Sequence, residues 1–152
     1  MTQVAVQTKI EAPAELVFRA VTDIERFPDI QPDVLAIDFL TGQRSGVGTR
    51  FVETRQHGRR LLKTELEVTE WVENERARMV TDSHGTVWDT VFSVRSSGAT
   101  SELEIAMDAR PHKLLPKIMN PLMKGFFRKG IAKYLDQLRD HCETEARAAR
   151  PD

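Results

Sequence analysis

The segment "NPLMKGFFRKGIAKYLDQLRDHC", residues 120–142, contains the apolar pattern from which the architecture can be inferred. Its apolar side chains recur at steps of four, four, three, four and four residues, which is the spacing of one face of an α-helix. The stripe consists of Met123, Phe127, Ile131, Tyr134, Leu138 and Cys142. Because a helix with one apolar face buries that face, we expect this segment to lie across the covered side of a sheet.

The start of this helix carries a signal for a break. Asn120 and Pro121 fit an N-cap and a first helical position, so we expect the helix to kink or restart there. Residues 113–119 would then form a preceding turn of helix. The region is a poor membrane span, because lysines and arginines interrupt its apolar residues and two prolines would disturb a spanning helix.

Upstream of residue 111 the sequence predicts strands, with two short helices near its start. Residues 3–10 alternate between two faces, as in a strand with one covered side. Pro13 opens a helical pattern, and a second short turn or helix, interrupted by Pro28, follows it. Residues 33–110 then contain successive strands separated by turn residues, which is typical of an antiparallel meander.

In three of the later strands the alternation assigns one dry face and one wet face. The dry-face residues are Leu62, Thr64, Leu66, Val68, Trp88, Thr90, Phe92, Val94, Leu103, Ile105, Met107 and Ala109. For the strand over residues 50–56 the sequence does not decide which face is buried. Either Phe51 or Val52 could be the first of the alternate residues that point to the covered side. The order of elements is therefore strand, two short helices, six strands and a long helix.

Three regions of the chain together resemble a known superfamily. They are "TKIEAPAELVFRAVTDIERFPDI" near the N-terminus, "GVGTRFVETR" followed by "EVTEWVENERARMV", and "PLMKGFFRKGIAKYLDQL" near the C-terminus. The chain is similar over residues 3–145 to the START-like or SRPBCC superfamily, and most to its polyketide cyclase/dehydratase and lipid-transport branch. The resemblance implies the α+β helix-grip fold, a seven-stranded curved antiparallel sheet around a long C-terminal helix, with two short helices after strand 1. We expect one domain over residues 1–147 and a frayed tail over residues 148–152.

The resemblance also implies a cavity between the sheet and the long helix. Members of this superfamily bind lipids, steroids, quinones or polyketides there, and some cyclise or hydrolyse what they bind, but no universal catalytic residue comes with the resemblance. The wall positions that it implies are Trp88, Thr90, Phe92, Met107, Met119, Met123, Phe126 and Phe127. Thr64 and Thr90 bring hydroxyls to the dry face, where they could orient a ligand or bond to nearby backbone or water.

The candidate catalytic residues are few. Asp82 and His84, two apart on a strand, would face the same way and could form an acid/base couple. Ser83 and Gly85 indicate a turn that would instead leave both side chains in water. Tyr134 is a third candidate. We expect no metal and no cofactor, since the four histidines are dispersed and the chain has one cysteine.

The charge and the absence of targeting signals limit the possible partners and the location of the protein. The net charge is −1, so we expect no nucleic-acid partner. The lack of a signal-peptide pattern and the single cysteine favour a soluble, cytoplasmic protein. Residues 110–133 carry seven lysines and arginines and no acidic residue. They form either a core helix with a solvated basic back or a segment that contacts an anionic membrane peripherally.

Three functions are consistent with this sequence. The leading hypothesis is binding or transport of a hydrophobic small molecule, such as a lipid, a quinone or a polyketide-like molecule, in the cavity. The first alternative is a cofactor-free polyketide cyclase/dehydratase, which would fold a reactive chain into a productive shape. The second alternative is an interaction or regulatory module with a closed cavity. The sequence leaves the oligomeric state open.

Overall fold

The elements of the fold follow the predicted order. The computed structural model describes residues 2–149. In chain order the elements are β1 (Thr2–Ile10), α1 (Ala14–Thr22), the 3₁₀ helix η1 (Ile24–Arg26), α2 (Phe27–Ile30), β2 (Val34–Phe39), β3 (Arg50–His57), β4 (Arg60–Val72), β5 (Arg76–Ser83), β6 (Thr86–Ser97), β7 (Thr100–Pro111), α3 (Leu114–Leu122) and α4 (Lys124–Ala149). Within the described residues, no helix is long and apolar enough to cross a membrane.

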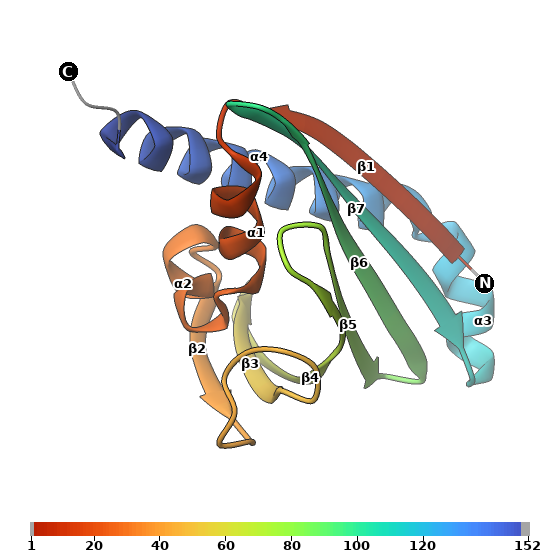
Figure 1. Cartoon of the computed structure of the whole chain (residues 1–152). Coiled ribbons are helices and arrows are strands. Elements are labelled where there is room, and N and C mark those ends of the chain that lie inside the picture. The colour runs from red at the N-terminus through yellow and green to blue at the C-terminus, as the bar shows by residue number, and fades with distance from the viewer. Residues whose placement is uncertain (1, 150–152) are drawn as a thin grey trace.

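The seven strands form one antiparallel sheet in the order β1-β7-β6-β5-β4-β3-β2 (Figure 1). Short turns join successive strands from β3 to β7, so the meander predicted from the turn residues is confirmed. The β5–β6 turn shows why its sequence is suited to a tight hairpin. Its two central residues, His84 and Gly85, have φ angles of 53° and 83°, and glycine adopts this left-handed region without steric cost.

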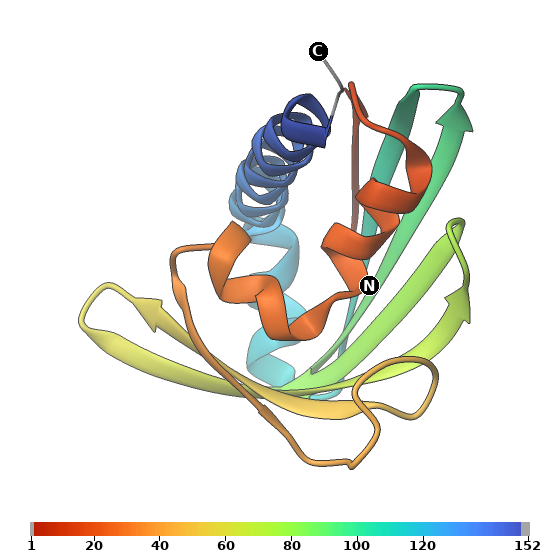
Figure 2. The same ribbon diagram turned by 60° about the vertical axis from the view of Figure 1, so that its left-hand side comes forward.

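The helices lie on the concave side of the curved sheet, as Figure 2 shows for α4, α1 and α2. Leu135, Leu138 and Cys142 on α4 are buried, and Ile131 and Tyr134 pack partly buried against the same core. The predicted apolar stripe of the long helix is therefore confirmed over these residues. Its burial against the sheet supplies most of the stability of such a helix.

The predicted position of the helix break was wrong by three residues. Pro121 lies inside α3, and the break falls at Met123, whose φ of −95° and ψ of 4° separate α3 from α4. Asn120 is not an N-cap, because it lies inside α3. Its side-chain amide instead donates a 3.1 Å hydrogen bond to Oγ1 of Thr86. Both groups are buried, so this bond satisfies polar atoms that would otherwise destabilise the fold.

The described part of α4 extends into the tail that we expected over residues 148–152. It runs to Ala149, and Ala146 is still buried. Residues 150–152 of the predicted tail lie outside the described residues.

The structure resolves the ambiguous strand. Phe51 on β3 is fully buried, whereas Val52 is partly exposed. Because side chains alternate along a strand, Glu53, Arg55 and His57 share the concave side with Phe51. Charged residues therefore face the interior at one edge of the sheet.

Candidate ligand-binding cavity

A cavity of about 460 Å³ lies between the concave face of the sheet and α4. Strands β3 to β7 form most of its wall, and α2 and α4 close it. Its lining consists of Phe27, Gln31, Glu53, Arg55, His57, Leu62, Thr64, Leu66, Met79, Thr81, Ser83, Trp88, Thr90, Phe92, Ile105, Met107, Phe126, Phe127, Gly130, Ile131 and Tyr134. Most of these side chains are apolar, as in sites for hydrophobic small molecules.

Two aromatic pairs connect α4 to strand β6 beside the cavity. Trp88 and Phe127 meet edge to face, with ring centroids 5.1 Å apart and an interplanar angle of 88°. Phe92 and Tyr134 form a second edge-to-face pair at 6.3 Å. Such pairs stabilise the contact beyond the burial of their area. They hold α4 against β6 beside the cavity.

A polar cluster interrupts this apolar wall on β3 and at the C-cap of α2. Arg55 donates hydrogen bonds from Nε and Nη2 to Oε1 of Glu53, at 3.1 and 2.9 Å. Its Nη2 also donates to Oε1 of Gln31 at 3.0 Å. The Glu53 side chain is only 13% exposed and that of Arg55 is 32% exposed. The cluster can therefore bind a polar group of a ligand from within a mostly apolar cavity.

Tyr134 is the other ionisable group deep in the cavity wall. Burial, followed by the negative charge of Glu53, raises the pKa of Tyr134 well above its ordinary value. The phenol therefore keeps its proton at neutral pH. It can donate a hydrogen bond to a ligand, but it is a poor general base.

The mouth of the cavity is marked by the lining residues that are exposed to solvent. These are His57 at the end of β3, and Phe126 and Gly130 on α4. Phe126 is 60% exposed and its ring lies 6.4 Å from that of Phe127. A large aromatic ring at an opening can contact a ligand that passes through it.

Most of the predicted wall residues meet at this cavity. Those that line it are Thr64, Trp88, Thr90, Phe92, Met107, Phe126 and Phe127, together with Tyr134. Met119 and Met123 are absent from the lining, since they lie on α3 and at the break after it. The structure therefore gathers the strand positions and the first turn of α4, but not the preceding helix.

The two other candidate catalytic residues lie outside the cavity. Asp82 is exposed, and its Oδ1 is 2.8 Å from Nε2 of His112. His84 occupies the β5–β6 turn, where its Nδ1 is 2.8 Å from Oγ of Ser83. The structure therefore does not bring Asp82 and His84 together as an acid/base couple, because the turn separates them.

Sequence reasoning missed Gln31, Glu53, Arg55 and His57 as lining residues. The signal was the parity of β3, since Phe51 on the buried side would have placed Glu53, Arg55 and His57 there as well. Charged residues at alternate positions resemble a wet face, and this hid the signal.

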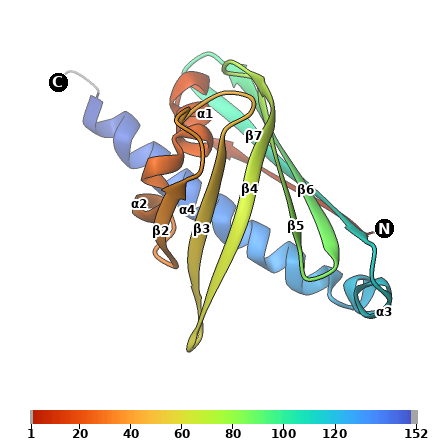
Figure 3. The same ribbon diagram turned by 90° about the horizontal axis from the view of Figure 1, so that it is seen from below.

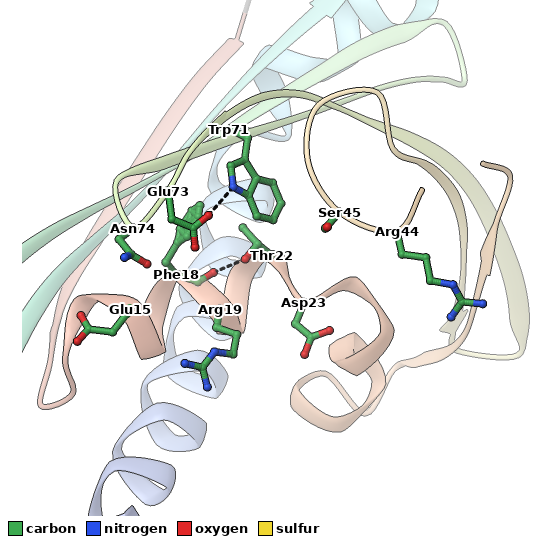
Figure 4. Close-up of a pocket in the computed structure, with 10 residues that line it drawn as sticks. All are labelled: Glu15, Phe18, Arg19, Thr22, Asp23, Arg44, Ser45, Trp71, Glu73 and Asn74. Carbon is green, nitrogen blue, oxygen red and sulfur yellow. Dashed lines mark hydrogen bonds between the residues drawn. The ribbon is translucent and has the colours of Figure 1, made fainter. Parts of the chain in front are cut away.

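A smaller hollow of about 310 Å³ lies between α1, the β2–β3 loop and the β4–β5 turn (Figure 4). Arg19, Arg44, Glu15 and Asp23 line it, so its charges are mixed. At its base, the indole Nε1 of Trp71 donates a 2.8 Å hydrogen bond to Glu73. This hollow lacks an apolar wall of the size found under α4.

No metal site is evident in the described part of the chain, where no three histidine, cysteine, aspartate or glutamate side chains gather in a way that could hold an ion.

Comparison with known proteins agrees with this architecture. A family model described as "Polyketide cyclase / dehydrase and lipid transport" matches residues 1–143. No curated protein matches the chain.

Several solved structures share the fold. TTHA0849 from Thermus thermophilus is 16% identical with a TM-score of 0.75, over 95% of this chain and 99% of that one. A START superfamily protein from Mycobacterium smegmatis is also 16% identical with a TM-score of 0.72, over 99% and 100%. Norcoclaurine synthase from Thalictrum flavum, in complex with dopamine and hydroxybenzaldehyde, is 12% identical with a TM-score of 0.72, over 99% and 88%. At these identities the likeness concerns the fold.

Proposed function

Because this chain belongs to the polyketide cyclase/dehydrase and lipid transport family, we propose that it binds or transports a hydrophobic small molecule in the cavity under α4. The ligand is a lipid, a quinone or a polyketide-like molecule. The observation that carries the proposal is a cavity of about 460 Å³ with a mainly apolar wall and one polar cluster.

The energetics are sufficient for useful affinity. Apolar surface contributes roughly 25 cal/mol per Å² removed from water, so burying about 200 Å² of a ligand contributes about 5 kcal/mol. A polar group on the ligand then bonds to the cluster of Gln31, Glu53 and Arg55. The ligand class is therefore amphipathic, with an apolar body and at least one hydrogen-bonding group.

The test is to identify what the purified protein carries. Native mass spectrometry after gentle extraction should find a bound apolar molecule, and a panel of lipids, quinones and aromatic polyketides should give saturable binding. A protein that carries no guest and binds nothing in the panel would refute the proposal.

A cofactor-free cyclase/dehydratase is the second candidate, favoured by the ionisable groups that line the cavity. Glu53 can accept a proton, His57 stands at the mouth, and protonated Tyr134 can donate a hydrogen bond to a carbonyl. The wall would supply most of the rate by folding the substrate. Turnover of a poly-β-ketone mimic by the protein, lost in Glu53→Gln, would support this candidate over binding alone.

The third hypothesis, an interaction or regulatory module with a closed cavity, gains no support from an interior that retains an open mouth. A cytoplasmic location is part of the proposal.

A further inference from the structure

Helix α3 presents its apolar residues to solvent. Among its nine residues, all of which the structure describes, only Asn120 is buried. The exposed fractions are 74% for Leu114, 70% for Leu115, 57% for Ile118, 41% for Met119 and 75% for Leu122. A surface helix of a globular protein normally shows the reverse pattern, with its apolar residues inward.

The geometry of α3 explains this inversion. Asn120 turns toward the sheet and bonds to Thr86. At about 100° per residue, Leu115, Ile118 and Leu122 lie on the opposite side of the helix, at spacings of three and four residues. They therefore form one apolar face that points away from the molecule.

Helix α3 lies at a corner of the molecule beyond the ends of the strands (Figure 3). Its main contacts are with β7 and α4. The exposed fractions of its apolar residues show that no described residue covers the outer face. Contiguous exposed apolar surface of this kind marks an interaction site.

The segment that carries this face has charges of one sign only. No acidic residue occurs from residue 109 to residue 135. Lys113, Lys117, Lys124 and Lys129 are exposed. Within the part of the chain that the structure describes, none of these four lysines forms an ion pair.

The apolar face also adjoins the mouth of the cavity. Phe126, which lines the mouth, follows Leu122 by four residues across the break at Met123. A partner that covers α3 would therefore lie beside the opening through which a ligand must pass.

We propose that α3 docks the protein on an anionic phospholipid bilayer. Leu115, Ile118 and Leu122 enter the boundary between headgroups and acyl chains, and the four exposed lysines contact the headgroups. The cavity mouth then faces the membrane, so an apolar ligand moves between bilayer and cavity without crossing water. This last step rests on the proposed function, whereas the docking does not.

Charge complementarity selects the bilayer over a second copy of this chain. A twofold contact through α3 would bring the lysines of one copy close to the lysines of the other, which is electrostatically unfavourable. An anionic surface instead meets the lysines with opposite charge.

The test is co-sedimentation of the full chain with unilamellar vesicles of phosphatidylcholine, either alone or with about 30 mol % phosphatidylserine. We expect binding to the anionic vesicles only, weakened at least fivefold by raising salt from about 0.1 to 0.5 M because the Debye length shortens. The double variant Ile118→Asp/Leu122→Asp should lose at least tenfold in binding. Lys117→Glu/Lys124→Glu should lose a similar factor.

Two matched controls use residues far from α3 in sequence. Val47 is 56% exposed in the β2–β3 loop, and Lys63 is exposed on β4. Val47→Asp and Lys63→Glu should bind the anionic vesicles like the unchanged protein. Circular dichroism confirms that each variant is folded.

Three outcomes overturn the inference: equal binding to neutral and anionic vesicles, no binding to either, or α3 variants that bind like their controls. A dimer in sedimentation equilibrium that Ile118→Asp/Leu122→Asp dissociates would also overturn it, in favour of a second copy. Ligand identification by native mass spectrometry in vesicle-free buffer separates the two proposals. A bound guest without vesicle binding refutes only the docking, and vesicle binding without any guest refutes only the proposed function.

Discussion

Arg55 and Glu53 lie two residues apart on β3, and the guanidinium of Arg55 donates two hydrogen bonds to a single oxygen, Oε1, of Glu53. No described residue is hydrogen-bonded to Oε2 of Glu53 or to Nη1 of Arg55. These two atoms are therefore available to a ligand in the cavity. The pair is held in place before binding, which lowers the entropic cost of recognition.

The first prediction concerns this pair. Arg55→Met should weaken binding of the polar-headed ligand by about tenfold or more, because a hydrogen bond to a charged group contributes about 1.5–3 kcal/mol. Isothermal titration with the ligand found by mass spectrometry measures the change. Arg50→Met is the matched control, since Arg50 lies on the same strand but pairs with Glu65 on the outer face. Equal affinities for the two variants would contradict a role for the cluster.

The second prediction uses the size of the cavity. Thr90 lines the cavity on β6, so Thr90→Phe should fill part of it and reduce ligand binding by about tenfold or more. The adjacent Val91 faces the opposite side of the sheet, and Val91→Phe should leave ligand binding unchanged. Binding curves for both variants, with thermal denaturation to show that each is folded, provide the comparison. Undiminished binding by Thr90→Phe would place the ligand elsewhere.

The third prediction concerns stability at alkaline pH. Burial raises the pKa of the Cys142 thiol to about 12 and raises that of Tyr134 also. The unfolded chain loses these protons first, so the free energy of unfolding should fall as the pH rises above about 9, by up to about 1.4 kcal/mol per unit for each group. Below about pH 9 these two groups should not make the free energy of unfolding depend on pH.

Denaturant unfolding between pH 7 and 11 measures this effect. The double variant Tyr134→Phe/Cys142→Ala should show a shallower alkaline loss than the unchanged protein, whatever its stability at neutral pH. Parallel curves for the two proteins above pH 9 would show that these groups are not buried in their protonated forms.

The fourth prediction concerns Asp89, which is 5% exposed on the outer side of β6. Arg78 Nε donates to its Oδ1 at 2.7 Å, and Arg110 Nη1 donates to its Oδ2 at 3.1 Å. The hydrogen bond from Arg78, then that from Arg110, outweighs burial and lowers the pKa of Asp89. Asp89→Asn should therefore reduce the free energy of unfolding at pH 7 by about 2 kcal/mol.

The pH dependence of this site has a definite sign. As pH falls toward 3, the unfolded chain takes up a proton at Asp89 before the folded protein does, so the stability due to this carboxylate is lost. Asp89→Asn should reduce that acid sensitivity. Asp38→Asn is the control, because Asp38 on β2 is exposed. Similar acid unfolding curves for Asp89→Asn and the unchanged protein would contradict the lowered pKa.

Local patterns in the sequence were enough to predict the order of the elements and which residues share a face, and the family resemblance added the helix-grip fold and the cavity. The apolar stripe of α4 and the alternation on β4, β6 and β7 are local periodicities, and they indicate which residues share a face before any neighbour is known. Local alternation predicted that Thr64, Trp88, Thr90, Phe92 and Met107 share the dry face, and the family resemblance implied that the last four are wall positions; all five line the cavity.

The packing of distant elements set which faces are covered where the local pattern was ambiguous or reversed. On β3, burial of Phe51 carried Glu53 and Arg55 inward. On α3, Asn120 bonds to Thr86 on the sheet side, so Leu115, Ile118 and Leu122 on the opposite side face outward. Met119 does not line the cavity. Periodicity tells which side chains point the same way, but burial depends on distant elements that pack against one side, and that contact is absent from the local sequence.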